Sequence, residues 1–321
     1  MDTGSHLLFG VTLGGLALID HNVASNPELA QAIMAGTIIG SNAPDFDTVT
    51  RLKGFKNYIK YHRGISHSIP ALIIWALLIS IPLSQIFNVQ NHWPYLFLWS
   101  FTAVSFHVFL DLLNSYGVQI LQPFQTERYR LDFLSIFEPF LFLLHFIGVV
   151  FWLVSDYAPG KIFFTVYLIT FVYIGLRYLQ HKVLINNLSS ELKINGNYYV
   201  FPNFNWLKWR FTIETTDSFY AGKVKSKKII LEDIYPKQER TNPVIQATMA
   251  TDGVRTFLKF AQGTHVTYKK IYDGYEVQWS DIRFWYNRKL PFGVDVLLDK
   301  ELNVVNQDLR WRKKAWDPPY V

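Results

Sequence analysis

Cysteine is absent from this chain of 321 residues, which excludes disulfide bonds and thiolate metal sites. A metal ion bound by side chains would therefore be held by His, Asp or Glu, a donor set that suits zinc or a similar divalent ion. Charged residues are sparse at 17%, whereas 50% of the residues are hydrophobic and 17% are aromatic. This composition is too apolar for an ordinary soluble protein and favours a membrane protein.

A basic segment before the first apolar stretch is also missing, so we expect no cleavable signal peptide. The formal net charge of +6 comes mainly from short loops and from the C-terminal third of the chain. Basic residues in such loops are typical topology signals of membrane proteins. We therefore expect a lipid bilayer, and no nucleic acid, as the partner of these charges.

Four apolar segments approach the roughly 20 residues that a helix needs to cross a bilayer. They are Ile69–Phe87, Tyr95–Leu113, Phe140–Val154 and Ile162–Leu179. Two earlier segments, Leu7–Ile19 and Leu29–Ala43, are shorter, and each is either a thin span or half of a re-entrant hairpin. The prediction is an α-helical polytopic membrane domain of four to six membrane segments over residues 1–185.

Lys and Arg are distributed unequally between the loops that would lie on opposite sides of the membrane. Loops 20–28, 88–94 and 156–161 carry only Lys161. The alternate loops carry Arg51, Lys53, Lys56, Lys60, Arg63, Arg128 and Arg130. Because basic loops stay in the cytoplasm, we expect a multi-pass protein of the inner or plasma membrane with both termini cytoplasmic.

Residues 186–321 have a different character, with short alternating runs typical of strands. Examples are Trp206–Phe211 and Thr264–Tyr268, with turn signals at Asp273-Gly274 and around Asp299–Glu301. One helix is expected near Asp252–Ala261. The prediction is a soluble, mostly β C-terminal domain.

Histidines and aspartates gather where the apolar segments begin or end. The set comprises His6, Asp45, Asp47, His62, His67, His107 and Asp111. The topology argued from Lys and Arg alone brings all of them to the cytoplasmic side. This convergence is an independent indication of one shared site.

The spacing of these residues supports a metal site. His107 and Asp111 are four apart and share one helix face, where an unpaired Asp would cost about 2.5–3.5 kcal/mol in a membrane. Asp45 and Asp47 alternate in a turn that contains proline, so their carboxylates can converge on one ion. Taken singly, each motif also fits a solvated turn or an intramembrane hydrogen bond; their coincidence favours the metal site.

The order of these motifs resembles that of the YdjM-type inner-membrane metal-dependent hydrolases over about residues 1–150. Its most specific part is His62-Arg63-Gly64 followed by His67-Ser68. The family's Asp-Pro after a short apolar run is Glu138-Pro139 here. The resemblance implies the metal ligands His6, Asp45, His62, His67, His107 and Asp111.

A second resemblance links the same series to the N-terminal ligands of the zinc-dependent phospholipase C group. That group's later His and acidic ligands have no clear equivalent in this chain. The C-terminal domain matches no motif.

These patterns lead to the hypothesis of a membrane-bound metal-dependent hydrolase at the cytoplasmic face. One or two divalent ions, zinc by the donor set, would activate water, with Asp47 or Glu138 as base. Arg63 would neutralise an anionic oxygen of the substrate, for which a phosphate ester such as a lipid headgroup fits.

Two other classes remain open. The chain could be a membrane-bound regulator or scaffold with a structural metal site, whose C-terminal domain binds a protein or DNA through exposed aromatics. Those aromatics would be Trp206, Trp209, Trp279, Trp285, Trp311 and Trp316. A transporter would line its path with the intramembrane His and Asp, but these groups gather at one side rather than at the midplane.

Overall fold

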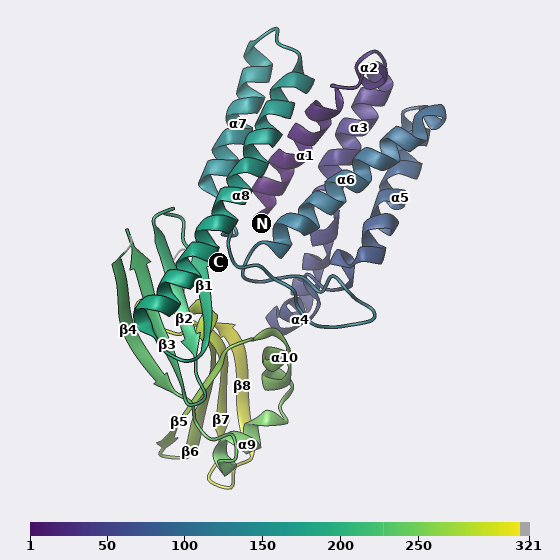
Figure 1. The fold of residues 1–321 in the computed structure, drawn as a ribbon. Coiled ribbons are helices and arrows are strands. Elements are labelled where there is room, and N and C mark those ends of the chain that lie inside the picture. Colours follow the sequence, from purple (N-terminus) through teal and green to yellow (C-terminus); the bar gives the residue numbers. More distant parts are fainter. Residues whose placement is uncertain (227, 315–321) are drawn as a thin grey trace. The chain divides into compact units, whose positions relative to one another are not determined.

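The computed structural model describes residues 1–226 and 228–314 (Figure 1). The chain divides into two compact units, described separately below. The membrane unit comprises residues 1–48 and 62–179, and the C-terminal unit comprises residues 49–61 and the chain from 180 onward. The sequence suggested a division between residues 185 and 186.

Apolar helices dominate the membrane unit, as the sequence predicts. They are α1 (Thr3–Ala17), α3 (Pro27–Gly40), α5 (Ile69–Ile86), α6 (Trp93–Leu112), α7 (Pro139–Val154) and α8 (Pro159–Leu192). Between them lie α2 (His21–Ala24), η1 (Ala43–Lys53), η2 (Ile65–His67) and η3 (Gln90–His92). Ile69–Ile86, Gln90–Leu112 and Pro159–Leu192 are long and apolar enough to span a membrane, and α7 is a shorter apolar helix. The prediction of a helical membrane domain is confirmed.

Local sequence signals set the starts of these helices. The side chain of Asp2 accepts a hydrogen bond from the Ser5 backbone nitrogen at the start of α1, and Asn26 caps α3 in the same way through Leu29. Proline occupies the first turn of α3, α5, α6 and α7, where its missing N–H costs nothing. Capping side chains therefore mark the starts of α1 and α3, and proline marks the starts of α5, α6 and α7.

Glycines allow α1, α3 and α6 to pack closely, as neighbouring helices in Figure 1. A Cβ atom on Gly10 would lie 2.8 Å from the Cα of Ile38, and one on Gly40 would lie 3.0 Å from the Ser100 carbonyl oxygen. Gly10 and Gly40 belong to two pairs spaced four residues apart, a pattern typical of tight contacts between membrane helices. The backbones at the ligand-bearing ends are consequently held at short range.

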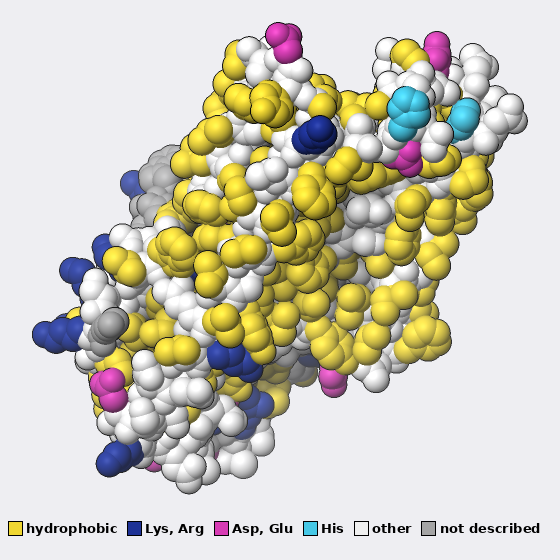
Figure 2. Space-filling view, turned by 45° about the horizontal axis from the view of Figure 1, so that its top comes forward, with side chains coloured by type: hydrophobic (Ala, Val, Ile, Leu, Met, Phe, Trp, Pro, Cys, Tyr) yellow, Lys and Arg dark blue, Asp and Glu magenta, His cyan; other side chains and the backbone are white. Residues whose placement is uncertain are grey.

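The outward faces of the membrane unit are apolar. Leu78, Leu153 and Val154 are between 61% and 76% exposed, and Figure 2 shows hydrophobic side chains over these helices. Such a surface would be a liability in water but matches the hydrocarbon interior of a bilayer.

The C-terminal unit contains two antiparallel four-stranded sheets with strands in sequence order. The first comprises β1 (Asn197–Pro202), β2 (Lys208–Glu214), β3 (Ser218–Lys225) and β4 (Lys228–Pro236). The second comprises β5 (Thr264–Ile271), β6 (Gly274–Asp281), β7 (Phe292–Leu298) and β8 (Val304–Trp311). Helices α9 (Pro243–Met249) and α10 (Asp252–Phe260) and the turn η4 (Ile282–Phe284) complete it. Both expected hairpins and the expected helix are confirmed.

The expectation of exposed tryptophans in this unit is wrong for three of them. Trp209, Trp279 and Trp285 are at most 2% exposed. The indole nitrogen of Trp279 donates to Thr248 Oγ1, so its polar atom is satisfied inside the core. Trp206 is exposed, Trp311 is half-buried, and Trp316 lies outside the described residues. In β2 the five consecutive residues 209–213 are buried, so both faces of that strand are covered, which strand alternation alone does not reveal.

Residues 49–61, which the sequence indicated only as a loop, pack within the C-terminal unit. They include α4 (Phe55–Tyr61), in which Lys56 forms an ion pair with Asp252. The rings of Phe55 and Phe292 are 6.4 Å apart. These contacts bring a segment from the first third of the chain into the core of the C-terminal unit.

Candidate metal centre

Three separate segments of the membrane unit carry the residues of the candidate metal centre. Asp45 lies in η1, His67 ends η2, and His107 and Asp111 lie in the last turns of α6. The helix places His107 and Asp111 on one face, as their spacing predicts. All four belong to one group whose ligand atoms lie within 4.8 Å of one another, so the structure brings these predicted ligands together.

The distances between the ligand atoms match a tetrahedral site. His107 Nε2 lies 3.3 Å from His67 Nε2 and 3.6 Å from Asp111 Oδ2. Asp45 Oδ1 lies 3.4 Å from His67 Nε2 and 3.6 Å from His107 Nε2. Tetrahedral ligand bonds of about 2.0–2.2 Å separate neighbouring ligand atoms by about 3.3–3.6 Å. These separations are therefore compatible with a divalent ion bound by the four residues.

Hydrogen bonds on the far side of each ring fix which nitrogen faces the centre. His107 Nδ1 lies 2.7 Å from the Ser41 carbonyl oxygen, which can only accept, so Nδ1 carries the hydrogen. Ser66 Oγ donates to Asp47 Oδ2 at 2.5 Å and accepts from His67 Nδ1 at 2.9 Å. In the neutral rings both Nε2 atoms then present lone pairs, the arrangement found in histidines that bind metal ions.

The two carboxylate oxygens at the centre lack hydrogen bonds. Asp45 Oδ1 and Asp111 Oδ2 are buried and form none with any described residue. Buried anionic oxygens without donors are costly. Two such oxygens facing two nitrogen lone pairs fit a divalent cation, and the donor set of two nitrogens and two oxygens is one that zinc accepts.

Arg63 and Asn114 orient Asp111. Arg63 donates through Nη2 to Asp111 Oδ1 at 2.8 Å and through Nη1 to Asn114 Oδ1 at 2.9 Å. Asn114 Nδ2 lies 3.3 Å from the same Asp111 oxygen. Both contacts hold Oδ1 away from the centre and leave Oδ2 facing it. The guanidinium is buried and makes these contacts inside the protein.

A second group shares Asp45 with the first. Asp45, Asp47 and His62 offer ligand atoms within 4.8 Å of one another and are half-buried. His62 Nδ1 lies 2.6 Å from Asp47 Oδ1 and 3.9 Å from Asp45 Oδ1. These side chains are 11–14% exposed, whereas those of His67 and Asp111 are fully buried. The second group therefore forms the more accessible side of the centre.

The acidities of the loop residues follow from their surroundings. Burial raises the pKa of Asp47, but hydrogen bonds from His62 and His67 outweigh it and hold that pKa well below its usual value. Burial lowers the pKa of His67, yet the neighbouring carboxylates raise it to about 10. A proton and a metal ion compete for the same His67 nitrogen. A carboxylate as acidic as Asp47 is a weak base.

Two further predicted residues lie outside both groups. His6 stacks on His107 with ring centroids 3.8 Å apart, and its Nε2 lies 3.6 Å from Asp111 Oδ1. Glu138 accepts from Tyr173 at 2.8 Å and lies 3.8 Å from Arg177, in a separate network. His6 thus borders the centre, whereas the structure does not bring Glu138 to it.

Sequence reasoning missed the residues that orient the ligands. Ser41 and Ser66 have no signal of their own, since serine is common near helix ends. Asn114, three residues after Asp111, belongs to the motif series of the family resemblance, but its spacing indicates no orienting role. Orientation depends on contacts between distant segments, which spacing along the chain does not encode.

Comparison with known proteins identifies the family of the membrane unit and of the C-terminal unit. Residues 1–184 match the family described as YdjM inner membrane protein, and residues 243–316 match the YfhP C-terminal alpha/beta plait domain. The chain is 31% identical over 322 residues to the "Uncharacterized protein YfhP" of Bacillus subtilis (strain 168), covering 97% of this chain and 95% of that protein. No solved structure matches it. With a match over more than half of its length and three membrane-capable helices, the chain belongs to the YdjM inner membrane protein family.

Proposed function

We propose that this protein is a membrane-bound metal-dependent hydrolase that acts at the cytoplasmic face. The observation that carries the proposal is the buried tetrahedral set of acceptor atoms from Asp45, His67, His107 and Asp111. Beside it, Asp47 and His62 form a more accessible polar group. Metal-assisted hydrolysis needs residues that hold the ion and, beside them, accessible polar groups that can contact substrate and water.

Asp45, His67, His107 and Asp111 would hold the ion, and zinc is the best fit to their donors. A divalent ion there would lower the pKa of a water molecule and polarise an ester oxygen. His62 would accept the proton. Burial holds its pKa below the ordinary value, so the ring is neutral at pH 7, and Asp47 at 2.6 Å orients it.

Arg63 receives a different role from the one expected on sequence. Its Nη1 and Nη2 atoms donate to Asn114 and Asp111, so we assign it the positioning of Asp111. Glu138 is not assigned a role as base, because it is engaged with Tyr173 and Arg177. The proton acceptor is therefore sought in the group that contains Asp47 and His62.

The positions of Lys and Arg residues support the proposed substrate class and the proposed cytoplasmic site of action. Seven of eight Lys and Arg residues in the short loops lie on the side of the ligands, which favours a cytoplasmic site. Arg128 donates to the His62 carbonyl oxygen at 2.8 Å, so one of these cations lies beside the accessible group. Cations there suit an anionic phosphate ester, such as a lipid headgroup.

A structural metal site is the second candidate. Four protein ligands leave no open position, and closed four-ligand sets are typical of structural zinc sites. In that case the chain would be a membrane-bound regulator or scaffold, and the ion would stabilise the membrane unit. This reading is favoured by the complete burial of His67 and Asp111.

An assay on purified full-length protein separates the two. Hydrolysis of phosphomonoester and phosphodiester probes would be measured after metal removal and after zinc is restored. We expect His62→Gln to keep the ion and lose turnover and His107→Gln to lose both. His92→Gln, at a half-buried site outside both groups, should change neither. Metal-loaded wild-type protein that hydrolyses neither probe class would support the structural role instead.

A further inference from the structure

The loop between β1 and β2 exposes large apolar side chains to its surroundings. Phe204 is 37% exposed, Trp206 is 45% exposed and Leu207 is 61% exposed. In water such neighbours are unfavourable, and exposed apolar clusters mark interaction sites. Trp and Phe are the residues that membrane proteins place at the level of lipid headgroups.

A hydrogen bond connects this loop to the end of an apolar span. The side chain of Gln180 in α8 donates to the Trp206 carbonyl oxygen at 3.2 Å. Gln180 lies within Pro159–Leu192, one of the described helices that are long and apolar enough to span a membrane. Trp206 therefore lies beside a turn of this membrane-capable helix.

Cations flank the loop on one face of the sheet. Lys208 lies opposite Lys225 in the register of β2 and β3, and Arg210 lies opposite Lys223. Lys223 is paired with Glu232, whereas Lys208 and Lys225 are exposed and form no ion pair with any described residue. Like charges facing each other across strands are destabilising, so an anion between them would be favoured. A cavity of about 170 Å³ is lined by these four side chains and by Asn203.

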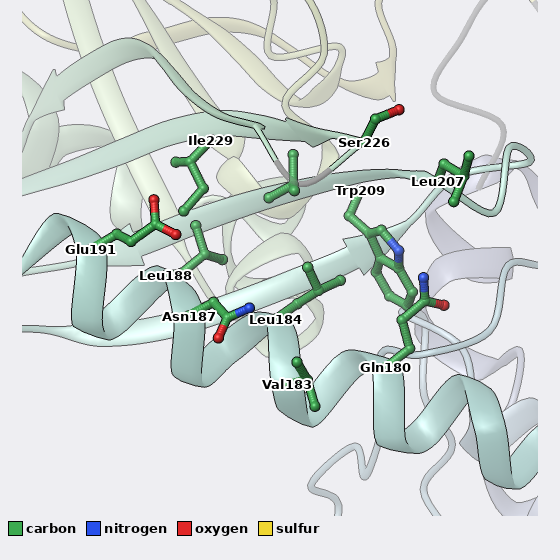
Figure 3. A pocket seen from close by; sticks show the side chains of 11 residues that line it. Gln180, Val183, Leu184, Asn187, Leu188, Glu191, Leu207, Trp209, Ser226 and Ile229 are labelled. Carbon is green, nitrogen blue, oxygen red and sulfur yellow. The ribbon is translucent and has the colours of Figure 1, made fainter.

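An apolar cavity adjoins the same loop. It has a volume of about 470 Å³ and is lined by Leu184 and Leu188 of α8 together with Leu207, Trp209 and Ile229 (Figure 3). In Figure 3 Leu184 and Leu188 point from the helix toward the strands. Lys208 and Lys225 alternate with Trp209 and Val224 along their strands, so the lysines lie on the opposite face of the sheet from this cavity. Exposed aromatics in the loop and exposed lysines beside it are the features that a phospholipid leaflet complements.

We propose that loop 203–207 inserts into the adjacent leaflet and that Lys208 and Lys225 bind the phosphates of its anionic phospholipids. The cytoplasmic leaflet is rich in such lipids and attracts juxtamembrane lysines. Phe204, Trp206 and Leu207 would lie at the headgroup boundary, where amphipathic surfaces are held by apolar burial. This docking is independent of any reaction at the metal centre.

The absence of native cysteine allows a direct test on the full-length chain. Leu207→Cys is labelled with an environment-sensitive fluorophore and reconstituted in nanodiscs that carry lipid-borne spin quenchers. Tyr272→Cys is the matched control, because Tyr272 is 91% exposed in the β5–β6 turn. We expect strong quenching at position 207 and little at position 272. Equal quenching at the two positions, or none at 207, would overturn the proposal.

Charge is tested by comparing discs of phosphatidylglycerol with discs of phosphatidylcholine. Each lysine near an anionic surface contributes about fivefold to the attraction. The double variant Lys208→Glu with Lys225→Glu should therefore abolish the excess quenching at position 207 in anionic discs, whereas Lys269→Glu on β5 should preserve it. Excess quenching that survives the double variant would contradict the lysine assignment. Disulfide-linked dimers of Leu207→Cys without lipid quenching would identify a second copy as the occupant and also overturn the proposal.

Discussion

His67 and His107 turn their Nε2 atoms toward each other at 3.3 Å, while Ser66 and Ser41 occupy the opposite ring nitrogens. In neutral rings this places two lone pairs face to face. A cation between the nitrogens, or a proton on one of them, is needed to relieve the repulsion. The same two atoms face the carboxylate oxygens of Asp45 and Asp111 that form no hydrogen bond with any described residue. A divalent ion therefore fits the group better than a single proton does.

Metal content is the first prediction. Purified protein should retain about one divalent ion per chain from the buried set. Asp111→Ala and His107→Ala should each lower this occupancy severalfold, because each removes one of four ligands. His92→Ala, outside both groups, should leave it unchanged. Elemental analysis gives the answer, and equally low metal in all forms would mean that a proton on His67 holds the carboxylates together.

The second prediction concerns Arg63. Arg63→Lys keeps the charge but cannot donate to Asp111 and Asn114 through a planar fork. Loss of a residue that orients a ligand costs about 10- to 100-fold in metal affinity, so we expect zinc to bind at least tenfold more weakly. Competition with a fluorescent chelator measures this affinity. Arg51→Lys, an exposed substitution in η1, serves as the control. Unaltered affinity in Arg63→Lys would refute the positioning role.

Helix spacing provides the third prediction. In Gly10→Ala the new Cβ would meet the Cα of Ile38 at 2.8 Å, so α1 and α3 must separate. Overpacking of this kind costs about 1–3 kcal/mol. Gly175→Ala has no atom within 4 Å of its new Cβ and should be neutral or slightly stabilising. Thermal unfolding in detergent compares the two, and equal melting temperatures would show that the α1–α3 contact can relax.

Topology is the fourth prediction. Single cysteines at Asn57 and Gln125 should react with a membrane-impermeant reagent only from the cytoplasm, because their loops carry the basic residues. Cysteines at Asn91 and Tyr157 should react from outside. Both of these positions are exposed in the membrane unit. Labelling of Asn57→Cys in intact cells would reverse the proposed orientation.

Sequence reasoning located the elements that carry strong periodic or turn signals. The hairpin at Asp273-Gly274 forms as predicted, since turn residues and strand alternation act locally. The grouping of Asp45, His67, His107 and Asp111 was also foreseeable, because each motif lies at the end of an apolar segment on the same side.

Long-range packing was not predictable in the same way. Pro159–Leu192 forms one continuous helix, although only the part to Leu179 is apolar, because helix propensity continues where the membrane signal stops. Phe55 packs against Phe292 without any local hint of that contact. Trp209 is buried, although it was expected among the exposed aromatics of the C-terminal domain. Each case depends on which distant surface covers the segment.

Because the ligands are far apart along the chain, a bound ion would also act as a cross-link. Asp45, His67 and Asp111 belong to segments separated by long stretches of sequence, so one bound ion would cross-link three points of the membrane unit. Closing a long loop costs only slightly more entropy than closing a short one. An ion that connects distant segments therefore restrains them at little additional entropic cost. In a protein without a single cysteine, the ion would perform the task that disulfides perform elsewhere. Its release would loosen the loops between these segments while leaving the apolar helices in the bilayer.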